Sequence, residues 1–258
     1  MQKMVIEKAV EVGTEKAVRK PGRLFALSVL AGVFISLGGV LSLILGFGFP
    51  EFSAANPGLQ KLISALAFPI GLFLVVMFGA DLFTGNNALL IPAVNERRIG
   101  PGAVITNWTM VWIGNFAGAL LFTFLMVVCC GMVDSEPYHG AIIRMAETKA
   151  ALSPLVTFLR GIGANWCVCL AVWLALGADT MGRKALACWI PVAAFVALGY
   201  EHAIANMFFI PCGMMVGADV SFAALGKNLF FATLGNIVGG ALMVGHFFHR
   251  LYGSRSNR

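Results

Sequence analysis

Six long stretches of mainly apolar residues follow one another along the chain, with short polar segments between them. They cover about residues 24–48, 60–92, 103–132, 152–177, 185–215 and 226–250. A helix needs about 20 mainly apolar residues to cross a bilayer, and each stretch is long enough. The pattern therefore predicts an all-α integral membrane protein with six transmembrane helices.

Polar residues interrupt the second and fifth stretches. Segment 79–86 (GADLFTGN) divides the second stretch, and segment 199–206 (GYEHAIAN) divides the fifth. Each brings an acidic residue, Asp81 or Glu201, to membrane depth. Irregular backbone is tolerated there only where it is buried in protein or lines a cavity. We therefore expect broken second and fifth helices beside a substrate path.

The two halves of the chain resemble each other. Aligning the interruptions matches three residues of each half: Gly79 with Gly199, Asp81 with Glu201, and Asn86 with Asn206. Segment 114–120 (GNFAGAL) also matches segment 235–242 (GNIVGGAL). Each half holds three stretches, an odd number, so the second half must enter the membrane from the opposite side. This predicts an inverted 3+3 repeat, about residues 24–132 and 152–250, with the substrate path between the halves.

The matched segments contain residues with expected structural roles. Two glycine pairs have the four-residue spacing that lets helices pack closely: Gly114 with Gly118, and Gly235 with Gly239. Asn115 and Asn236 lie beside them, and we expect them to form hydrogen bonds between helices.

Composition and charge agree with a membrane location. Of the 258 residues, 59% are hydrophobic and 12% are charged, against about 25% charged in soluble domains. Of the 18 lysines and arginines, 13 lie on the side that holds both termini, and positively charged loops stay in the cytoplasm. Both termini are therefore expected in the cytoplasm. The basic residues lack interleaved aromatic residues, so no nucleic-acid partner is expected.

The chain divides into three expected regions. Residues 1–23 form a cytoplasmic N-terminal segment, residues 24–250 the six-helix domain, and residues 251–258 a cytoplasmic tail. Apolar residues recur at helical spacing through the first region: Met4, Val5, Ala9, Val12 and Lys16, whose stem is apolar. This favours an amphipathic helix at the membrane surface, with a frayed polar tail as the alternative.

The six cysteines all lie within apolar stretches, where they act as small packing residues. Disulfides of secreted proteins lie in loops instead. Cys167 and Cys169 lack the second ligand pair of a zinc site, so neither a metal nor another cofactor is expected.

Few ionisable residues lie at membrane depth. Asp81 and Glu201 precede the second halves of the broken helices, where a carboxylate can cap free N–H groups or contact a substrate. His202 can donate a hydrogen bond to an anion and can change its protonation, or it can be an ordinary buried histidine. Thr84 and Asn165 supply further donors. A membrane-embedded enzyme is not expected, because these residues form neither a metal site nor a nucleophile with its base.

Four features together resemble the formate/nitrite transporter family: Leu72, segment 79–85, Asn165 and segment 199–207 (GYEHAIANM). The resemblance extends over about residues 4–250. It implies an aquaporin-like helical fold and a homopentamer with one pore in each protomer. It also implies a multi-pass protein of a bacterial or archaeal inner membrane.

The same resemblance implies roles for particular residues. Two apolar constrictions are expected, the outer one from Phe68 and Phe195, the inner one from Leu72, Leu82 and Val168. A loop of Leu82, Phe83 and Thr84 is expected to gate the cytoplasmic side. His202 would face the centre, positioned by Thr84 and Asn165, while Asp81, Glu201 and Asn206 support the breaks. Lys149, placed in an outer loop, would draw anions toward the pore.

The function that follows is transport of a small monovalent anion, with formate as the first choice. Nitrite, hydrosulfide and lactate are alternatives on the same scaffold. The sequence leaves open whether the anion crosses as such or together with a proton carried through His202.

Overall fold

A computed structural model describes residues 2–253, and these residues form helices without any β-strand. The α-helices before the midpoint are α1 (Gln2–Ala17), α2 (Pro21–Phe47), α3 (Pro50–Ala55), α4 (Pro57–Ala67), α5 (Ile70–Met77), α6 (Phe83–Asn95) and α7 (Pro101–Phe122), followed by the π-helix η1 (Thr123–Val128). Then come α8 (Tyr138–Ala151), α9 (Pro154–Gly177), α10 (Met181–Ala197), α11 (Ala203–Met215), α12 (Phe222–Ile237), the π-helix η2 (Val238–His246) and α13 (Phe247–Tyr252). The predicted all-α class is confirmed, and the part of the expected tail at residues 254–258 lies outside the described residues.

Five helical segments are long and apolar enough to cross a membrane, by length and composition: Pro21–Phe47, Pro57–Met77, Pro101–Val128, Pro154–Gly177 and Phe222–Tyr252. The fifth predicted stretch is not among them. Its 17-residue α10 and 13-residue α11 are separate helices, each shorter than the about 20 residues that a span requires. Five stretches thus contain a membrane-long helix, and the fifth stretch is divided at residues 198–202, where a break was expected.

Both predicted breaks begin at a glycine in the left-handed region. Gly79 has φ +62° and Gly199 has φ +68°, a conformation that residues with a Cβ rarely adopt. The next N–H then reaches back five residues, from Ala80 to the Val75 carbonyl and from Tyr200 to the Phe195 carbonyl, at 3.0 and 3.1 Å. This is the usual way in which a glycine ends an α-helix. The residue before each following helix, Leu82 or His202, is extended.

Glycines allow two pairs of helices to cross closely. A Cβ on Gly118 would lie 2.0 Å from the Val29 carbonyl oxygen, and one on Gly235 would lie 2.1 Å from that of Phe158. Only glycine therefore allows α2 to cross α7, and α9 to cross α12, at this distance. The expected packing role of the spaced glycines is confirmed.

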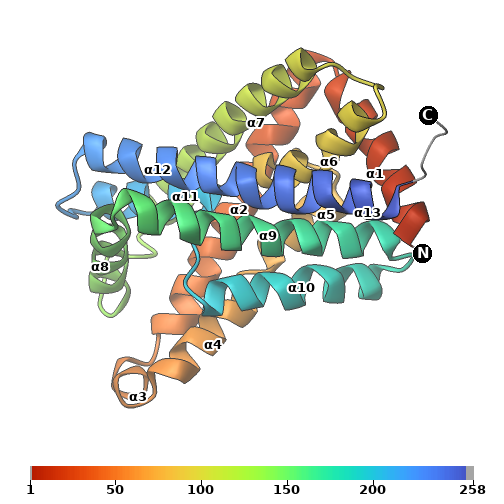
Figure 1. Ribbon diagram of the computed structural model, residues 1–258. Helices are drawn as coiled ribbons and strands as arrows, with labels where there is room; N and C mark the ends of the chain where they lie inside the picture. The colour runs from red at the N-terminus through yellow and green to blue at the C-terminus, as the bar shows by residue number, and fades with distance from the viewer. Residues whose placement is uncertain (1, 254–258) are drawn as a thin grey trace.

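The two short amphipathic helices lie at opposite ends of the bundle (Figure 1). The first, α1, lies at the end where α13 also lies, and α8 lies at the other end. One face of α1 packs against α6 and buries Val5, Ile6, Ala9, Gly13 and Lys16. Met4 and Val12 are not fully buried, so the buried face is rotated from the one expected. Lys16 of α1 bonds Asp81 and Lys149 of α8 bonds Glu201, so each of these helices reaches one of the two breaks.

Candidate functional site

The two helix breaks meet in the interior, where Thr84 and His202 are in contact. Thr84 lies in the first turn of α6, and His202 is the residue just before α11. The Thr84 Oγ1 and His202 Nε2 atoms are 2.9 Å apart, and both side chains are buried. The sequence indicated both residues as candidates, and the structure brings them together.

A backbone contact fixes the tautomer of His202. The Nδ1 atom accepts a hydrogen bond from the Ala205 N–H at 3.1 Å and so caps α11. A neutral imidazole then carries its proton on Nε2, which donates to the Thr84 hydroxyl oxygen. That oxygen has no other hydrogen-bond partner within residues 2–253, so its own proton can point to a third group.

Asn165 holds Thr84 through the backbone rather than through the imidazole. Its Nδ2 lies 3.2 Å from the Thr84 carbonyl oxygen, 3.1 Å from Asn87 Oδ1 and 2.6 Å from the Asn236 carbonyl oxygen. Cys169 also donates to the Thr84 carbonyl. The sequence reading missed Asn87 and Cys169. Their helical spacing from the named residues, three after Thr84 and four after Asn165, is the signal that would have indicated them.

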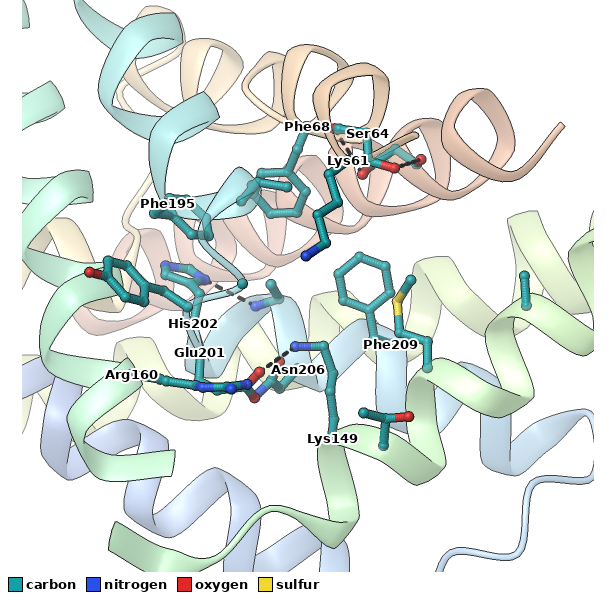
Figure 2. A pocket seen from close by; sticks show the side chains of 18 of the residues that line it. Lys61, Ser64, Phe68, Lys149, Arg160, Phe195, Glu201, His202, Asn206 and Phe209 are labelled. Atoms are coloured by element: carbon teal, nitrogen blue, oxygen red, sulfur yellow. Dashed lines mark hydrogen bonds and ion pairs between the residues drawn. The ribbon is translucent and has the colours of Figure 1, made fainter. Parts of the chain in front are cut away.

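One cavity, of about 430 Å³, opens at the α8 end and reaches His202 (Figure 2). Phe68 and Phe195 close its inner part, with ring centroids 5.6 Å apart and planes at 84°. The Phe195 ring also stacks on the imidazole of His202 at 5.8 Å. The wall is therefore aromatic next to the Thr84–His202 contact and polar farther out.

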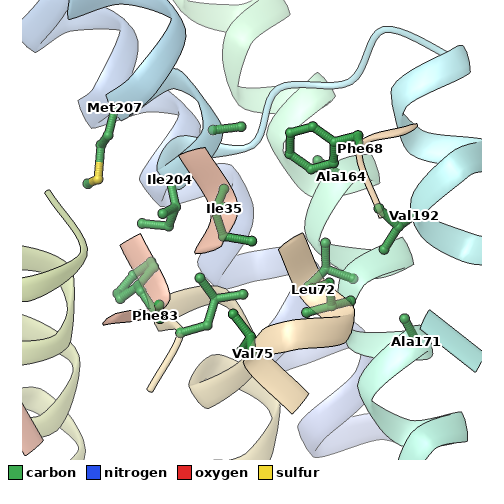
Figure 3. Packing of buried hydrophobic residues seen from close by; sticks show 14 of the residues in the cluster. Ile35, Phe68, Leu72, Val75, Phe83, Ala164, Ala171, Val192, Ile204 and Met207 are labelled. Carbon is green, nitrogen blue, oxygen red and sulfur yellow. The ribbon is translucent and has the colours of Figure 1, made fainter. Parts of the chain in front are cut away.

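A second cavity, of about 520 Å³, opens at the α1 end. Leu72 and Leu82 line it, and both belong to the buried apolar cluster that also holds Phe68 (Figure 3). Val168 belongs to this cluster too but lines neither cavity. The two cavities are thus separated by buried apolar residues and by the Thr84–His202 contact.

Phe83 points away from both cavities. Its ring packs against Trp108 at 6.2 Å and lines an apolar groove between α7 and α12. Within the expected loop of Leu82, Phe83 and Thr84, only the first and third residues therefore face the interior path.

The Asp81 carboxylate is buried among cations from the N-terminal segment. Lys16 Nζ lies 2.7 Å from its Oδ1, and Arg19 bonds its Oδ2. Asn86 Nδ2 donates to Oδ1 at 3.1 Å. Burial lowers the pKa of the Lys16 ammonium, and attraction to Asp81 opposes that change. Lys16 and Arg19 were not expected at this site, because they precede the first apolar stretch.

The Glu201 carboxylate has a similar arrangement with one cation. Lys149 Nζ lies 2.8 Å from Oε1, and Asn206 Nδ2 donates to Oε2 at 2.7 Å. Asn228 Nδ2 is 3.4 Å from the same oxygen. Lys149 was expected in a loop, but it occupies the last turn of α8. Helical structure there directs its ammonium inward onto Glu201.

Neither carboxylate caps a helix, so the capping role that the sequence left open is wrong. The capping positions belong to the next residue, Leu82 before α6 and His202 before α11. Within residues 2–253, Asp81 and Glu201 accept hydrogen bonds only from side chains. They neutralise neighbouring cations instead.

Asparagines satisfy the backbone of the breaks. Asn115 Oδ1 accepts from the Phe83 N–H at 2.9 Å, and its Nδ2 donates to the carbonyls of Asp81 and Ser28 at 2.9 and 2.8 Å. These bonds join α7 to α2 and to the first break. The expected interhelical role of Asn115 is confirmed.

Asn236 repeats this scheme at the second break. Its Oδ1 accepts from the Ala203 N–H at 2.8 Å, and its Nδ2 donates to the carbonyls of Glu201 and Gly161 at 3.0 and 2.8 Å. The expected role of Asn236 is likewise confirmed. Backbone groups that would cost several kcal/mol if left unpaired in a membrane are thus bonded at both breaks.

Comparison with known proteins gives consistent matches. A sequence profile of formate/nitrite transporters matches residues 3–250. The formate channel FocA of Escherichia coli strain K12 is 36% identical, over 95% of this chain and 91% of its own length. A solved FNT family ion channel superposes with a TM-score of 0.87 at 28% identity, covering 97% of this chain and 98% of the other. A pentameric formate channel with formate bound superposes with a TM-score of 0.79 at 30% identity, covering 91% and 98%.

These relatives are channels and transporters, which confirms the expectation that the chain is not an enzyme. The profile match covers nearly the whole sequence and includes both broken segments. The chain belongs to the formate/nitrite transporter family.

Proposed function

We propose that this protein conducts small monovalent anions across a membrane, with formate as its first substrate. The observation that carries the proposal is the Thr84–His202 contact, which lies between two cavities that open at opposite ends of the helical bundle. The relative FocA is a formate channel, and a structural neighbour holds formate. Nitrite, hydrosulfide and lactate remain alternative substrates on the same scaffold.

The proposed path alternates apolar and polar surfaces. Phe68 and Phe195 form the outer constriction, and Leu72, Leu82 and Val168 the inner one. A bare anion loses its hydration between such residues at a large cost in free energy. The hydroxyl of Thr84 and the Nε2–H of His202 lie between the constrictions and offset that cost by donating hydrogen bonds. Alternatively, the anion takes up a proton, in which case His202 is the group that passes it on.

The helix breaks support the proposal electrostatically. Both α6 and α11 begin at the Thr84–His202 contact, so their N-terminal ends face the centre of the path. Helix N-termini carry partial positive charge and free N–H groups, which favour an anion. The matched bonds of Asn115 and Asn236 support an aquaporin-like fold in which two inverted 3+3 repeats form the path. Asp81, Glu201 and Asn206 then hold the breaks, and the segment of Leu82, Phe83 and Thr84 at the start of α6 gates the inner side.

The proposed arrangement in the membrane follows from charge and from the structural neighbour. The α1 end is cytoplasmic together with both termini, residues 24–250 form the membrane domain, and the α8 end faces outward. A homopentamer with one path in each protomer is supported by the pentameric neighbour. The host membrane is a bacterial or archaeal inner membrane.

Flux into liposomes tests the proposal. Protein reconstituted in vesicles should transport formate faster than acetate, and parallel assays with nitrite, hydrosulfide and lactate at two pH values rank the alternatives. Empty vesicles and vesicles with His202→Asn protein are the controls. If no small anion crosses faster than in empty vesicles, the proposed function is wrong.

A further inference from the structure

The cavity at the α8 end carries more positive charge than Lys149 supplies. Four cationic side chains line it, from α4, α8 and α9: Lys61, Arg144, Lys149 and Arg160. Glu201 is the only acid among the lining residues. The cavity is therefore electropositive. Which of the four cations act on an entering anion depends on which of them already form ion pairs with acidic residues.

Lys149 is already neutralised. Its ammonium lies 2.8 Å from Glu201 Oε1, and the two side chains are 17% and 3% exposed. The same ammonium lies 5.7 Å from the centre of the Phe209 ring. Taken together, Lys149 and Glu201 present no net charge to the cavity, so Lys149 attracts an anion from outside only weakly.

Lys61, Arg144 and Arg160 are exposed, and none of them forms an ion pair within residues 2–253. Arg144 lies near Glu136, since a Cβ on Gly140 would approach both side chains. Its charge is therefore partly compensated. For Lys61 and Arg160 the described residues show no acidic side chain in contact with the cation, although the Arg160 carbonyl accepts a hydrogen bond from the Glu201 N–H at 3.3 Å.

Lys61 and Arg160 approach the cavity from different walls. Lys61 lies on α4, one turn before Ser64 and two turns before Phe68, and Arg160 lies on α9. Figure 2 shows the Lys61 side chain reaching toward the space between Phe195 and Phe209, whereas the Lys149 ammonium turns to Glu201. Two uncompensated cations thus flank the approach to the Phe68–Phe195 pair.

We propose that Lys61 and Arg160 form an outer recruitment site for small carboxylates, and that Lys149 instead holds Glu201 in place. This inference rests on the proposed function for the identity of the anion. Charges that line a concave surface raise the local concentration of oppositely charged solutes, and salt screens the effect. The site acts before the aromatic constriction and does not require the anion to lose its hydration.

A test that does not depend on transport measures local anion concentration by thiol labelling. Thr148 is exposed and lines the same cavity, so Thr148→Cys reports on it. The background replaces Cys129, Cys130 and Cys167 by Ser, because these cysteines are not fully buried. Purified protein in nonionic detergent is labelled with an anionic and a cationic methanethiosulfonate, and the ratio of the two rates is recorded.

At an ionic strength of about 0.01 M, where the Debye length is about 30 Å, the double variant Lys61→Gln with Arg160→Gln should lower the anionic-to-cationic rate ratio by about 3- to 10-fold. The difference should vanish near 1 M salt. Lys227→Gln, a half-buried cation on α12 outside this cavity, is the matched control and should leave the ratio unchanged.

An unchanged ratio in the double variant, or an equal fall in Lys227→Gln, overturns the proposed recruitment site. Flux in liposomes is the second readout, in which the double variant should raise the half-saturating formate concentration about threefold at low salt only. Wild-type protein that transports no anion would refute the proposed function, while the labelling ratio would still decide on the cation site.

Discussion

At the Asp81 break two cations hold the carboxylate, Lys16 and Arg19, whereas at the Glu201 break Lys149 acts alone. The remaining bonds agree closely. An asparagine five residues on donates to each carboxylate, Asn86 at 3.1 Å and Asn206 at 2.7 Å. The two breaks therefore share their asparagine support and differ in how the charge of the carboxylate is balanced.

Lys16 and Lys149 also correspond in their backbone hydrogen bonds, although α1 and α8 are not membrane-spanning helices. Asn107 Nδ2 donates to the Lys16 carbonyl at 3.1 Å, and Asn228 Nδ2 donates to the Lys149 carbonyl at 2.9 Å. Each lysine therefore bonds a break through its side chain and a neighbouring helix through its backbone. The N-terminal helix α1 thus has the same structural role at one end as α8 has at the other.

The largest expected difference between the breaks is the response to losing a lysine. Lys149→Met leaves Glu201 buried without a cation, and breaking a buried ion pair from one side costs about 3 kcal/mol or more. Lys16→Met should cost about 1 kcal/mol, because Arg19 still bonds Asp81. Thermal unfolding of the purified proteins in detergent measures both.

The control for this prediction is a double variant. Lys149→Met combined with Glu201→Gln removes both charges and should recover most of the lost stability. Equal losses for Lys16→Met and Lys149→Met would mean that Arg19 contributes nothing to the Asp81 break.

The second prediction concerns the shared part of the breaks. Asn236→Ala removes three hydrogen bonds to backbone groups, those of Gly161, Glu201 and Ala203. Asn115→Ala removes three equivalent bonds to backbone groups. With about 0.6 kcal/mol for each bond in a membrane protein, both variants should lose about 2 kcal/mol of unfolding free energy. A difference of more than about 1 kcal/mol between them would show that the supports are unequal.

The length of the apolar stretches predicted the membrane helices, and the polar residues matched between the two halves predicted the two helix breaks. The breaks after Gly79 and Gly199 were predicted because a glycine and an acidic residue interrupt each apolar stretch, and the structure gives these glycines a positive φ. The pairing of Lys16 with Asp81 was not found, because α1 lies outside the apolar stretches and a contact across 65 residues has no local signal. Capping by the two carboxylates was left open, since sequence alone does not show that nearby cations bind them.

From the residues alone, Thr84 and His202 were two separate candidates, and only the family resemblance implied that Thr84 positions His202. Their hydrogen bond depends on how the two halves pack, and the role of His202 as the cap of α11 depends on the direction of its ring. The contact of Lys149 with Glu201 was likewise not predicted from the sequence. Its helix α8 directs it onto Glu201, which spacing in the sequence does not reveal.

The third prediction separates the two breaks by function. Thr84→Val removes the acceptor of the His202 Nε2–H and should reduce flux about fivefold, as expected for the loss of about 1 kcal/mol from one hydrogen bond.

His202→Asn should keep assembly intact but change the dependence of flux on pH, because an amide does not titrate. Vesicle flux at several pH values measures both, with Thr84→Ser as the conservative control. A wild-type pH profile in His202→Asn would refute a proton-passing role.

The smallest single effect is expected for Arg19→Gln. Arg19 also bonds the exposed Glu15, and Lys16 continues to neutralise Asp81, so the variant should lose less than about 1 kcal/mol. The Arg19→Gln variant is most informative when it is combined with Lys16→Met. In the Arg19→Gln background the Asp81 break has one cation, as the Glu201 break does, and Lys16→Met should then cost as much as Lys149→Met. Unfolding measurements on the four proteins of this cycle test whether the second cation alone distinguishes the breaks. If Lys16→Met remains mild without Arg19, the difference arises instead from the way α1 and α8 pack on the bundle.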